Sequence, residues 1–134
     1  MPPRVVAAER WSYVVTDSGS EDGSKTHKPK PGYKAKDKGA RLLVDYTSVS
    51  GNGAFSIGFL RTYTSQAVAR LSCVAPCTCQ ERTVYAGTTH HTSTTVMDRT
   101  HTDFDTPGDG PACRIQLELT TEGEIFKFIA LHVY

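Results

Sequence analysis

Cysteines are the residues of this chain whose spacing points most directly to chemistry. Three of the four lie within seven positions, in the pattern Cys73-x3-Cys77-x-Cys79, and Cys113 follows more than thirty residues later. A structural zinc site usually takes pairs of ligands from two loops. Here the second loop offers a single cysteine, and the histidines lie in other segments. Disulfide bonds are therefore the favoured interpretation, with metal binding as the alternative.

The pairing of the cysteines stays open, because four cysteines allow three arrangements. Cys77 and Cys79 are separated by one residue and are poorly placed to bond to each other, so one of the three clustered cysteines should reach Cys113. Cys73 ends a predicted strand and Cys113 begins one, as neighbouring antiparallel strands would present them. Disulfides indicate an oxidising compartment, so we expect a secreted protein or one of the Golgi lumen or cell wall. Because the sequence opens without a signal peptide, this expectation implies a leader outside it.

An arginine interrupts an apolar strand face in the middle of the chain. Residues 55–63 alternate, and Arg61 falls in register with Phe59 and Tyr63. In one interpretation the core ends at Phe59 and Arg61 emerges into solvent. In the other, the face is open, aromatic rings stack on the apolar faces of sugars, and the arginine bonds hydroxyls or carboxylates. The candidate ligand-binding residues are Arg61, Tyr63, Phe59 and Tyr33.

Acidic residues offer weaker candidates for metal binding or catalysis. Asp103, Asp105 and Asp109, together with Asp98 and His101, could supply oxygen ligands for calcium, but their spacing matches no defined loop. The pair Glu122 and Glu124 falls in a turn, where solubility explains it better than acid–base chemistry. We therefore expect no enzyme activity and no cofactor, with calcium as an open possibility and a metal-dependent enzyme as the remote alternative.

Composition limits the class of partner. Charged residues make up 22% of the chain and the formal net charge is +1, a balance that gives no reason to expect nucleic acid. No apolar run approaches the roughly 20 residues that span a bilayer, so no membrane partner is expected. The expected partner is a polysaccharide or a glycoprotein glycan, and self-association is an alternative.

The strands that must position these residues are marked by alternating hydrophobicity. Residues 1–9 are predicted to be a tail, residues 10–16 the first strand, and residues 17–39 a long Lys-rich loop. A second strand at 40–48 and a third at 55–63, joined by a Gly-rich turn, predict a hairpin. Four further segments alternate or are β-prone, and residues 125–134 are apolar enough for a central strand.

These segments predict an all-β protein of about eight strands, because no window shows helical periodicity. Short strands joined by Gly/Pro turns favour a disulfide-stapled antiparallel β-sandwich of jelly-roll type, like galactose-binding domains, in one domain over residues 10–134. In this architecture we expect the first strand to pair with the last.

A family resemblance is found at residues 58–79. Gly58-Phe59-Leu60-Arg61-Thr62-Tyr63 and the ending Leu71-x-Cys73-x3-Cys77-x-Cys79 resemble a stretch of plant and green-algal secretory proteins that are SGNH/GDSL-like or uncharacterised. Agreement extends to Pro31-Gly32-Tyr33 and to the strand opened by Cys113. The resemblance implies a C-terminal β-sandwich beside a separate hydrolase-like domain, and no catalytic residue carries over.

Together these observations predict a non-catalytic, carbohydrate-binding or accessory domain of a secreted or Golgi-lumenal protein. The alternative is a structural or assembly module of an extracellular or filamentous complex. In that module the Lys-rich loop of one copy would meet the Asp-rich loop of another.

Overall fold

The computed structural model describes the chain in six stretches, and only the backbone is described at residues 54, 98–101 and 112. The stretches are residues 3–15, 31–47, 54–74, 79–89, 94–101 and 112–133. Within them the chain forms ten strands. They are β1 (Arg4–Glu9), β2 (Ser12–Val14), β3 (Gly32–Ala35), β4 (Arg41–Thr47), β5 (Ala54–Arg61), β6 (Val68–Val74), β7 (Arg82–Tyr85), β8 (Thr94–His101), β9 (Ala112–Leu119) and β10 (Phe126–Val133). These stretches contain no helix with the length and apolar character needed to cross a membrane.

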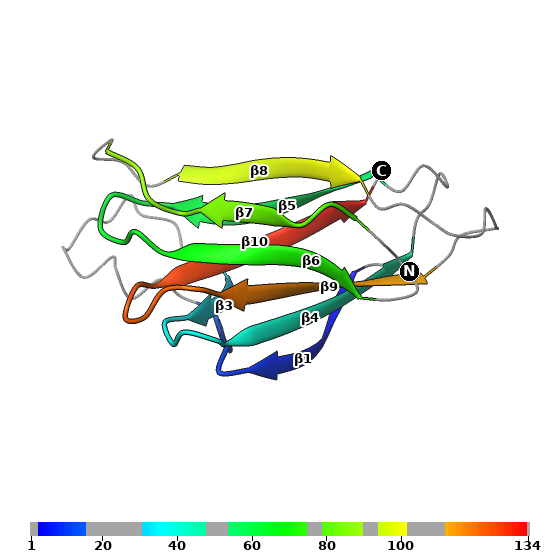
Figure 1. Ribbon diagram of the computed structural model, residues 1–134, viewed down its shortest axis with the longest axis horizontal. Coiled ribbons are helices and arrows are strands. Elements are labelled where there is room, and N and C mark those ends of the chain that lie inside the picture. The colour runs from blue at the N-terminus through cyan, green and yellow to red at the C-terminus, as the bar shows by residue number, and fades with distance from the viewer. Residues whose placement is uncertain are drawn as a thin grey trace.

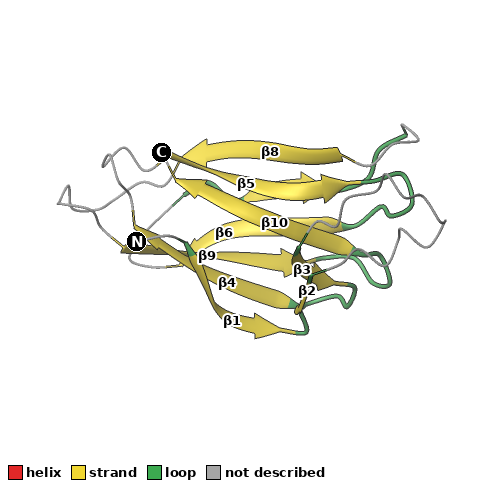
Figure 2. Ribbon diagram, turned by 180° about the vertical axis from the view of Figure 1, so that it is seen from behind, coloured by secondary structure: helices red, strands yellow, loops and turns green. Residues whose placement is uncertain are grey.

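The strands form two five-stranded sheets packed face to face. The first sheet has the order β1-β4-β9-β6-β7 and faces the viewer in Figure 1. The second has the order β2-β3-β10-β5-β8 and is in front in Figure 2. Neighbouring strands are antiparallel throughout. The expectation of an antiparallel β-sandwich is therefore confirmed.

The hydrophobic core lies between the sheets, on the faces that alternation predicts. Leu42, Val44 and Tyr46 of β4 are buried, as are alternate residues of β6 and β9, whereas residues 55–59 of β5 are buried without interruption. Aromatic contacts join the elements: the rings of Phe59 and Phe126 stack with centroids 5.6 Å apart, and Trp11 meets Phe126 edge-on at 6.0 Å. Such pairs add about 0.5–1.5 kcal/mol each beyond the area they bury.

In the N-terminal part of the chain, the number of strands and their pairing differ from the prediction. Residues 4–9, expected to be a tail, form β1 at the edge of the first sheet. Residues 32–35, expected to lie in the Lys-rich loop, form β3. Because β3 pairs with both β2 and β10, the first predicted strand does not pair with the last. The predicted hairpin is also wrong, since β4 and β5 belong to different sheets.

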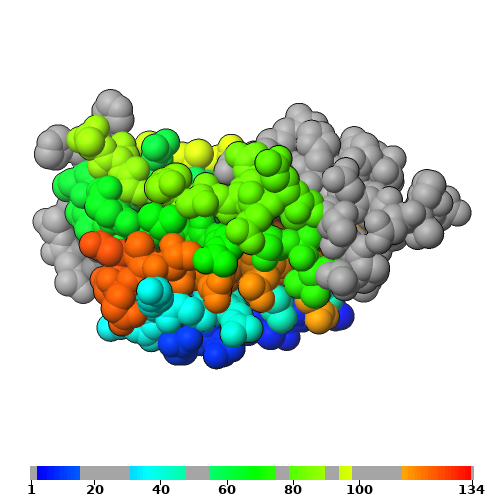
Figure 3. All heavy atoms as spheres, in the orientation of Figure 1, coloured from blue at the N-terminus to red at the C-terminus, as the bar shows by residue number. Residues whose placement is uncertain are grey.

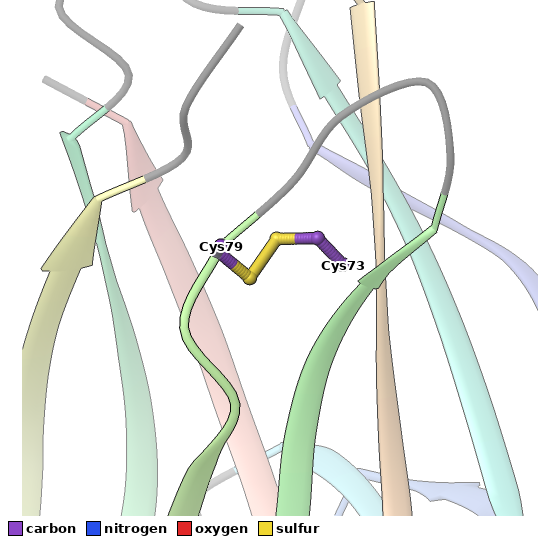
Figure 4. Close-up of a disulfide and its surroundings, with 2 residues drawn as sticks. All are labelled: Cys73 and Cys79. Carbon is purple, nitrogen blue, oxygen red and sulfur yellow. A yellow bond between two sulfur atoms is a disulfide. The ribbon is translucent and has the colours of Figure 1, made fainter.

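Disulfide bonds staple the sandwich, as expected, but the pairing differs from the one suggested by strand order. Cys73 at the end of β6 bonds to Cys79, with Cα atoms 5.6 Å apart (Figure 4). Cys113 is disulfide-bonded as well, and Cys77 lies outside the described residues. Cys73 is opposite Ile115 and Cys113 is opposite Tyr46 in the sheet, so the register does not bring Cys73 to Cys113.

Candidate functional site

Several connections between strands lie at one end of the sandwich, the left end in Figure 1. We call this region the turn end and define it by residues 36–40, 61–67, 86–89 and 120–125. It lies opposite the end of β6 that carries Cys73 (Figure 1). Arg61 and Tyr63, both predicted to bind ligand, belong to it.

Glu124 holds the β5–β6 connection in place. One of its carboxylate oxygens, Oε2, accepts hydrogen bonds from Ser65 Oγ at 3.1 Å and from the Gln66 backbone N–H at 3.0 Å. Ser65 is buried and has a second acceptor in the Ile125 carbonyl at 2.8 Å. The carboxylate thus fixes a loop that is distant in sequence, a role more specific than the turn solubility expected for it.

Glu122 does the same for the β3–β4 turn. Its Oε2 accepts the Lys38 backbone N–H at 2.7 Å, and Arg10 Nη1 donates to the Lys38 carbonyl at 3.3 Å. The Gly39 N–H donates to the Leu119 carbonyl at 2.7 Å. Arg10 is the only described non-glycine residue with positive φ, at 61°. These bonds make the turn end a pre-organised surface that requires little ordering when a ligand binds.

Arg61 is held at this end by a neutral group. Its side chain is exposed, and Nε donates to the Gly87 carbonyl at 3.2 Å. Gln66 packs over the same glycine, because a Cβ at Gly87 would overlap Gln66 Oε1. The side chains of Arg61 and Gln66 therefore both approach Gly87. A side chain at this position would collide with Gln66.

Tyr63 exposes its ring at the turn end, and Tyr85 exposes its ring beside it, on the outer face of the first sheet opposite Val68. Tyr63 is 46% exposed and Tyr85, the last residue of β7, is 61% exposed. Tyr63 follows Thr62, whose N–H donates to the Ala86 carbonyl at 2.8 Å and whose carbonyl accepts the Thr88 N–H at 3.1 Å. Thr62 Oγ1 also accepts the Thr64 N–H at 3.2 Å, which closes a tight turn around Tyr63. These hydrogen bonds of the neighbouring residues fix the main chain from which the Tyr63 ring projects.

Phe59 and Tyr33 are placed elsewhere. Phe59 is 4% exposed and packs in the core, so its ring offers no face to a ligand and the proposed direct contact is corrected. Tyr33 lies on β3, separated from β5 by β10, and meets the exposed Tyr13 edge-on at 5.1 Å. The structure does not bring Tyr33 to Arg61, and a role for Tyr33 in binding stays a separate prediction.

Outer-face charges of the first sheet are paired with one another. Arg41 and Arg70 lie 3.9 and 3.8 Å from Glu118, and Arg114 contacts Asp45 through Nε at 2.6 Å and Nη2 at 3.1 Å. Figure 3 looks onto this face, where bands of atoms from neighbouring strands follow one another. The hydrogen bonds from Arg114 hold the pKa of Asp45 below its usual value, and those to Asp45 raise the pKa of Arg114.

The predicted metal candidates are not tested by these contacts. Asp103, Asp105 and Asp109 lie outside the described residues, as do most of the Lys-rich and Asp-rich loops expected to mediate assembly. Among the residues that are described, no group of three or more His, Cys, Asp or Glu side chains could hold a metal ion.

Sequence analysis missed Glu124, Gln66, Gly87 and Tyr85 as parts of the site. Gly87 was predicted only as the last residue of a β-prone segment at residues 81–87, whereas the observed strand β7 ends at Tyr85. The acceptor role of Glu124 had no signal, because its partners lie 58 and 59 positions away in sequence.

No family model and no curated protein matches this sequence. Solved structures do match. A family two carbohydrate esterase from Clostridium thermocellum in complex with cellohexaose has a TM-score of 0.57 and 12% identity over 98% of this chain, which spans 31% of the length of that protein. The resemblance to plant and green-algal secretory proteins therefore stays a prediction.

Two other structures match from end to end. The C-terminal CBM6 of LamC, a marine laminarinase from Zobellia galactanivorans, has a TM-score of 0.53 and 10% identity, with 96% of this chain and 92% of that one covered. Xyl-CBM35 in complex with a glucuronic acid containing disaccharide has a TM-score of 0.57 and 16% identity, with coverage of 100% and 93%. At such low identity these likenesses establish the β-sandwich fold.

Proposed function

We propose that this protein is a non-catalytic carbohydrate-binding domain that contacts a polysaccharide or a glycoprotein glycan through the turn end. Arg61 and Tyr63 are the central contacts, and Tyr85 and Gln66 are added from the structure. No metal is assigned to the site.

The observation that carries the proposal is the end-to-end match with whole binding modules. Xyl-CBM35 and the CBM6 of LamC are each covered over more than nine-tenths of their length, so the similarity is to complete modules. The carbohydrate esterase chain is similar over only 31% of its length. These proportions favour a binding module over a complete enzyme.

The chemistry of the turn end suits a sugar. A saccharide presents apolar C–H faces together with rings of hydroxyl groups, so an exposed aromatic ring and fixed polar donors are complementary to it. Tyr63 and Tyr85 supply the rings, and Arg61 and Gln66 supply the polar groups. Because hydrogen bonds donated to Glu122 and Glu124 hold the loops in place, little conformational entropy is lost on binding.

The wider setting follows from the disulfides. A bonded Cys73–Cys79 pair and a bonded Cys113 suit an oxidising compartment, so we place the domain outside the cytosol, as an accessory part of a secreted or Golgi-lumenal protein. The similarity to plant and green-algal secretory proteins agrees with this setting.

An array of plant, algal and animal glycans tests the proposal. We expect the wild-type domain to bind at least one polysaccharide, and Tyr63→Ala to reduce that binding at least tenfold without changing thermal unfolding. Tyr13→Ala is the matched control, because Tyr13 is exposed at the far edge of the second sheet. A wild-type domain that binds nothing on the array would contradict the proposal, as would equal losses in the two variants.

A further inference from the structure

Arg61 differs from the paired arginines of the first sheet in its hydrogen-bond partner. Arg41, Arg70 and Arg114 each lie within ion-pair distance of a carboxylate on the outer face of that sheet. Arg61 donates its Nε to the Gly87 carbonyl, and within the described stretches it makes no other hydrogen bond or ion pair. No carboxylate of those stretches therefore pairs with its positive charge.

The bond from Nε leaves the terminal edge of the guanidinium available. A guanidinium carries five N–H donors in a plane, and the four on Nη1 and Nη2 remain after Nε is used. Two of these, one from each Nη atom, form a fork whose spacing matches the two oxygens of a carboxylate. Because Nε is already bonded to the backbone, less rotamer entropy remains to be lost when the fork engages an anion.

The acids at the same end do not compete for Arg61. Glu122 and Glu124 accept backbone and hydroxyl donors from other loops. Lys36 and Lys38, on the β3–β4 turn at this end, are exposed and add positive potential. The turn end thus combines a fixed planar cation with occupied carboxylates.

We propose that the saccharide bound at the turn end carries a carboxylate, as in a uronic acid, and that the Nη edge of Arg61 binds this group. The proposal rests on the proposed function and adds the class of saccharide to it. A carboxylate is favoured over a neutral hydroxyl pair because both partners are then charged and its two oxygens can accept from the fork in a bidentate pair.

The test uses acidic oligosaccharides in two forms. Oligogalacturonates and glucuronic acid-substituted xylo-oligosaccharides are presented unmodified and after reduction of each carboxyl to a primary alcohol, and affinities are measured by calorimetry. The wild-type domain is expected to bind the unmodified form of at least one pair about ten- to a hundredfold more tightly than the reduced form. Arg61→Gln is expected to bind both forms equally, at the affinity that wild type shows for the reduced form.

Two further variants sharpen the assignment. Arg61→Lys keeps the charge and loses the fork, and should retain only a few-fold preference for the unmodified form. Arg70→Gln removes an arginine paired with Glu118 and should keep the full preference. Thermal unfolding of each variant reports whether the fold is intact.

Each contrary outcome has a separate meaning. Equal wild-type binding of both forms overturns the carboxylate and leaves the proposed function standing. A preference that survives in Arg61→Gln overturns the role of Arg61. Tighter binding of sulfated saccharides than of carboxylated ones replaces the carboxylate with a sulfate. Failure to bind any saccharide, reduced forms and the neutral glycans of the array included, overturns the proposed function itself.

Discussion

The arginines on the outer face of the first sheet and Arg61 at the turn end differ in their partners. On the outer face of the first sheet, Arg41 and Arg70 flank Glu118, and Arg114 contacts Asp45. At the turn end, the carboxylate of Glu124 accepts neutral donors, and Arg61 donates to a backbone carbonyl. A paired cation helps neighbouring strands to fit together, whereas a cation held by a neutral group keeps its charge for a ligand. On the basis of this comparison we infer that the turn end is the better candidate for ligand binding, although both regions are charged.

Separate removal of Arg61 and of a paired arginine tests whether the two groups differ in function. Arg61→Ala should weaken saccharide binding by about 2 kcal/mol, since it removes charged hydrogen bonds to the ligand. It should leave the free energy of unfolding nearly unchanged, because one exposed bond to Gly87 is lost. Calorimetric titration with the glycan identified by the array, together with urea denaturation, measures both quantities.

Arg70→Ala is the matched control for that experiment. It removes an exposed ion pair with Glu81 and one with Glu118, and should lower stability by less than about 1 kcal/mol with no change in affinity. Equal losses of affinity in Arg61→Ala and Arg70→Ala would mean that pairing with a carboxylate does not distinguish structural arginines from ligand-binding ones in this protein.

Removal of the Cys73–Cys79 disulfide tests whether the turn end keeps its structure independently of the opposite end of the sandwich. The double variant Cys73→Ser/Cys79→Ser opens a loop of sequence separation 6. The chain-entropy relation gives about 2 kcal/mol of lost stability for so short a loop. Affinity for the glycan should not change at temperatures where the variant is folded. Urea denaturation and calorimetry measure the two effects, and a parallel loss of affinity would show that the ends are coupled.

Glu124 is the point at which the turn end should be most sensitive to a single carboxylate. Glu124→Ala removes the acceptor of the Gln66 N–H and of Ser65 Oγ, at a cost of about 1–2 kcal/mol in stability. Release of the β5–β6 connection should also weaken glycan binding several-fold. Glu81→Ala is the control, because Glu81 forms an exposed ion pair with Arg70. Equal free energies of unfolding for Glu124→Ala and Glu81→Ala would contradict the role of Glu124 in holding the β5–β6 connection.

The core could be predicted from sequence because alternation reports directly on burial. Every second residue of β4 and β9 is apolar, and these are the residues that lie between the sheets. Strands β1 and β3 were missed for a physical reason. Residues 4–9 are mostly exposed or half-buried at a sheet edge, and β3 has four residues in a Lys-rich stretch. Such strands depend on pairing with β4 and β10, which local patterns do not reveal.

The site was predicted only in part, because its geometry depends on contacts that are distant in sequence. Arg61 and Tyr63 were found from the charge that interrupts an apolar face. The carbonyl that anchors Arg61 lies 26 positions away, and the carboxylate that holds Gln66 lies 58 positions away. Phe59 was assigned to the wrong environment, since register alone does not show where the core ends.

Lowering the pH should produce the smallest of the expected effects, a change in the stability that the Asp45–Arg114 pair contributes on the outer face of the first sheet. Hydrogen bonds from Arg114 lower the pKa of Asp45 in the folded protein, so the ionised carboxylate adds stability at pH values above its unfolded pKa of about 4. This contribution is lost as the pH falls through the depressed folded pKa. The wild-type protein should therefore be slightly more stable than Asp45→Asn at pH 7, and the difference should shrink as the pH falls below about 4. Urea denaturation at pH 7, 5 and 3 measures it, and glycan affinity at pH 7 should be equal in the two proteins. A stability difference that is as large at pH 3 as at pH 7 would assign the effect of the substitution to packing, and the Asp45–Arg114 charge pair would then contribute less than its geometry indicates.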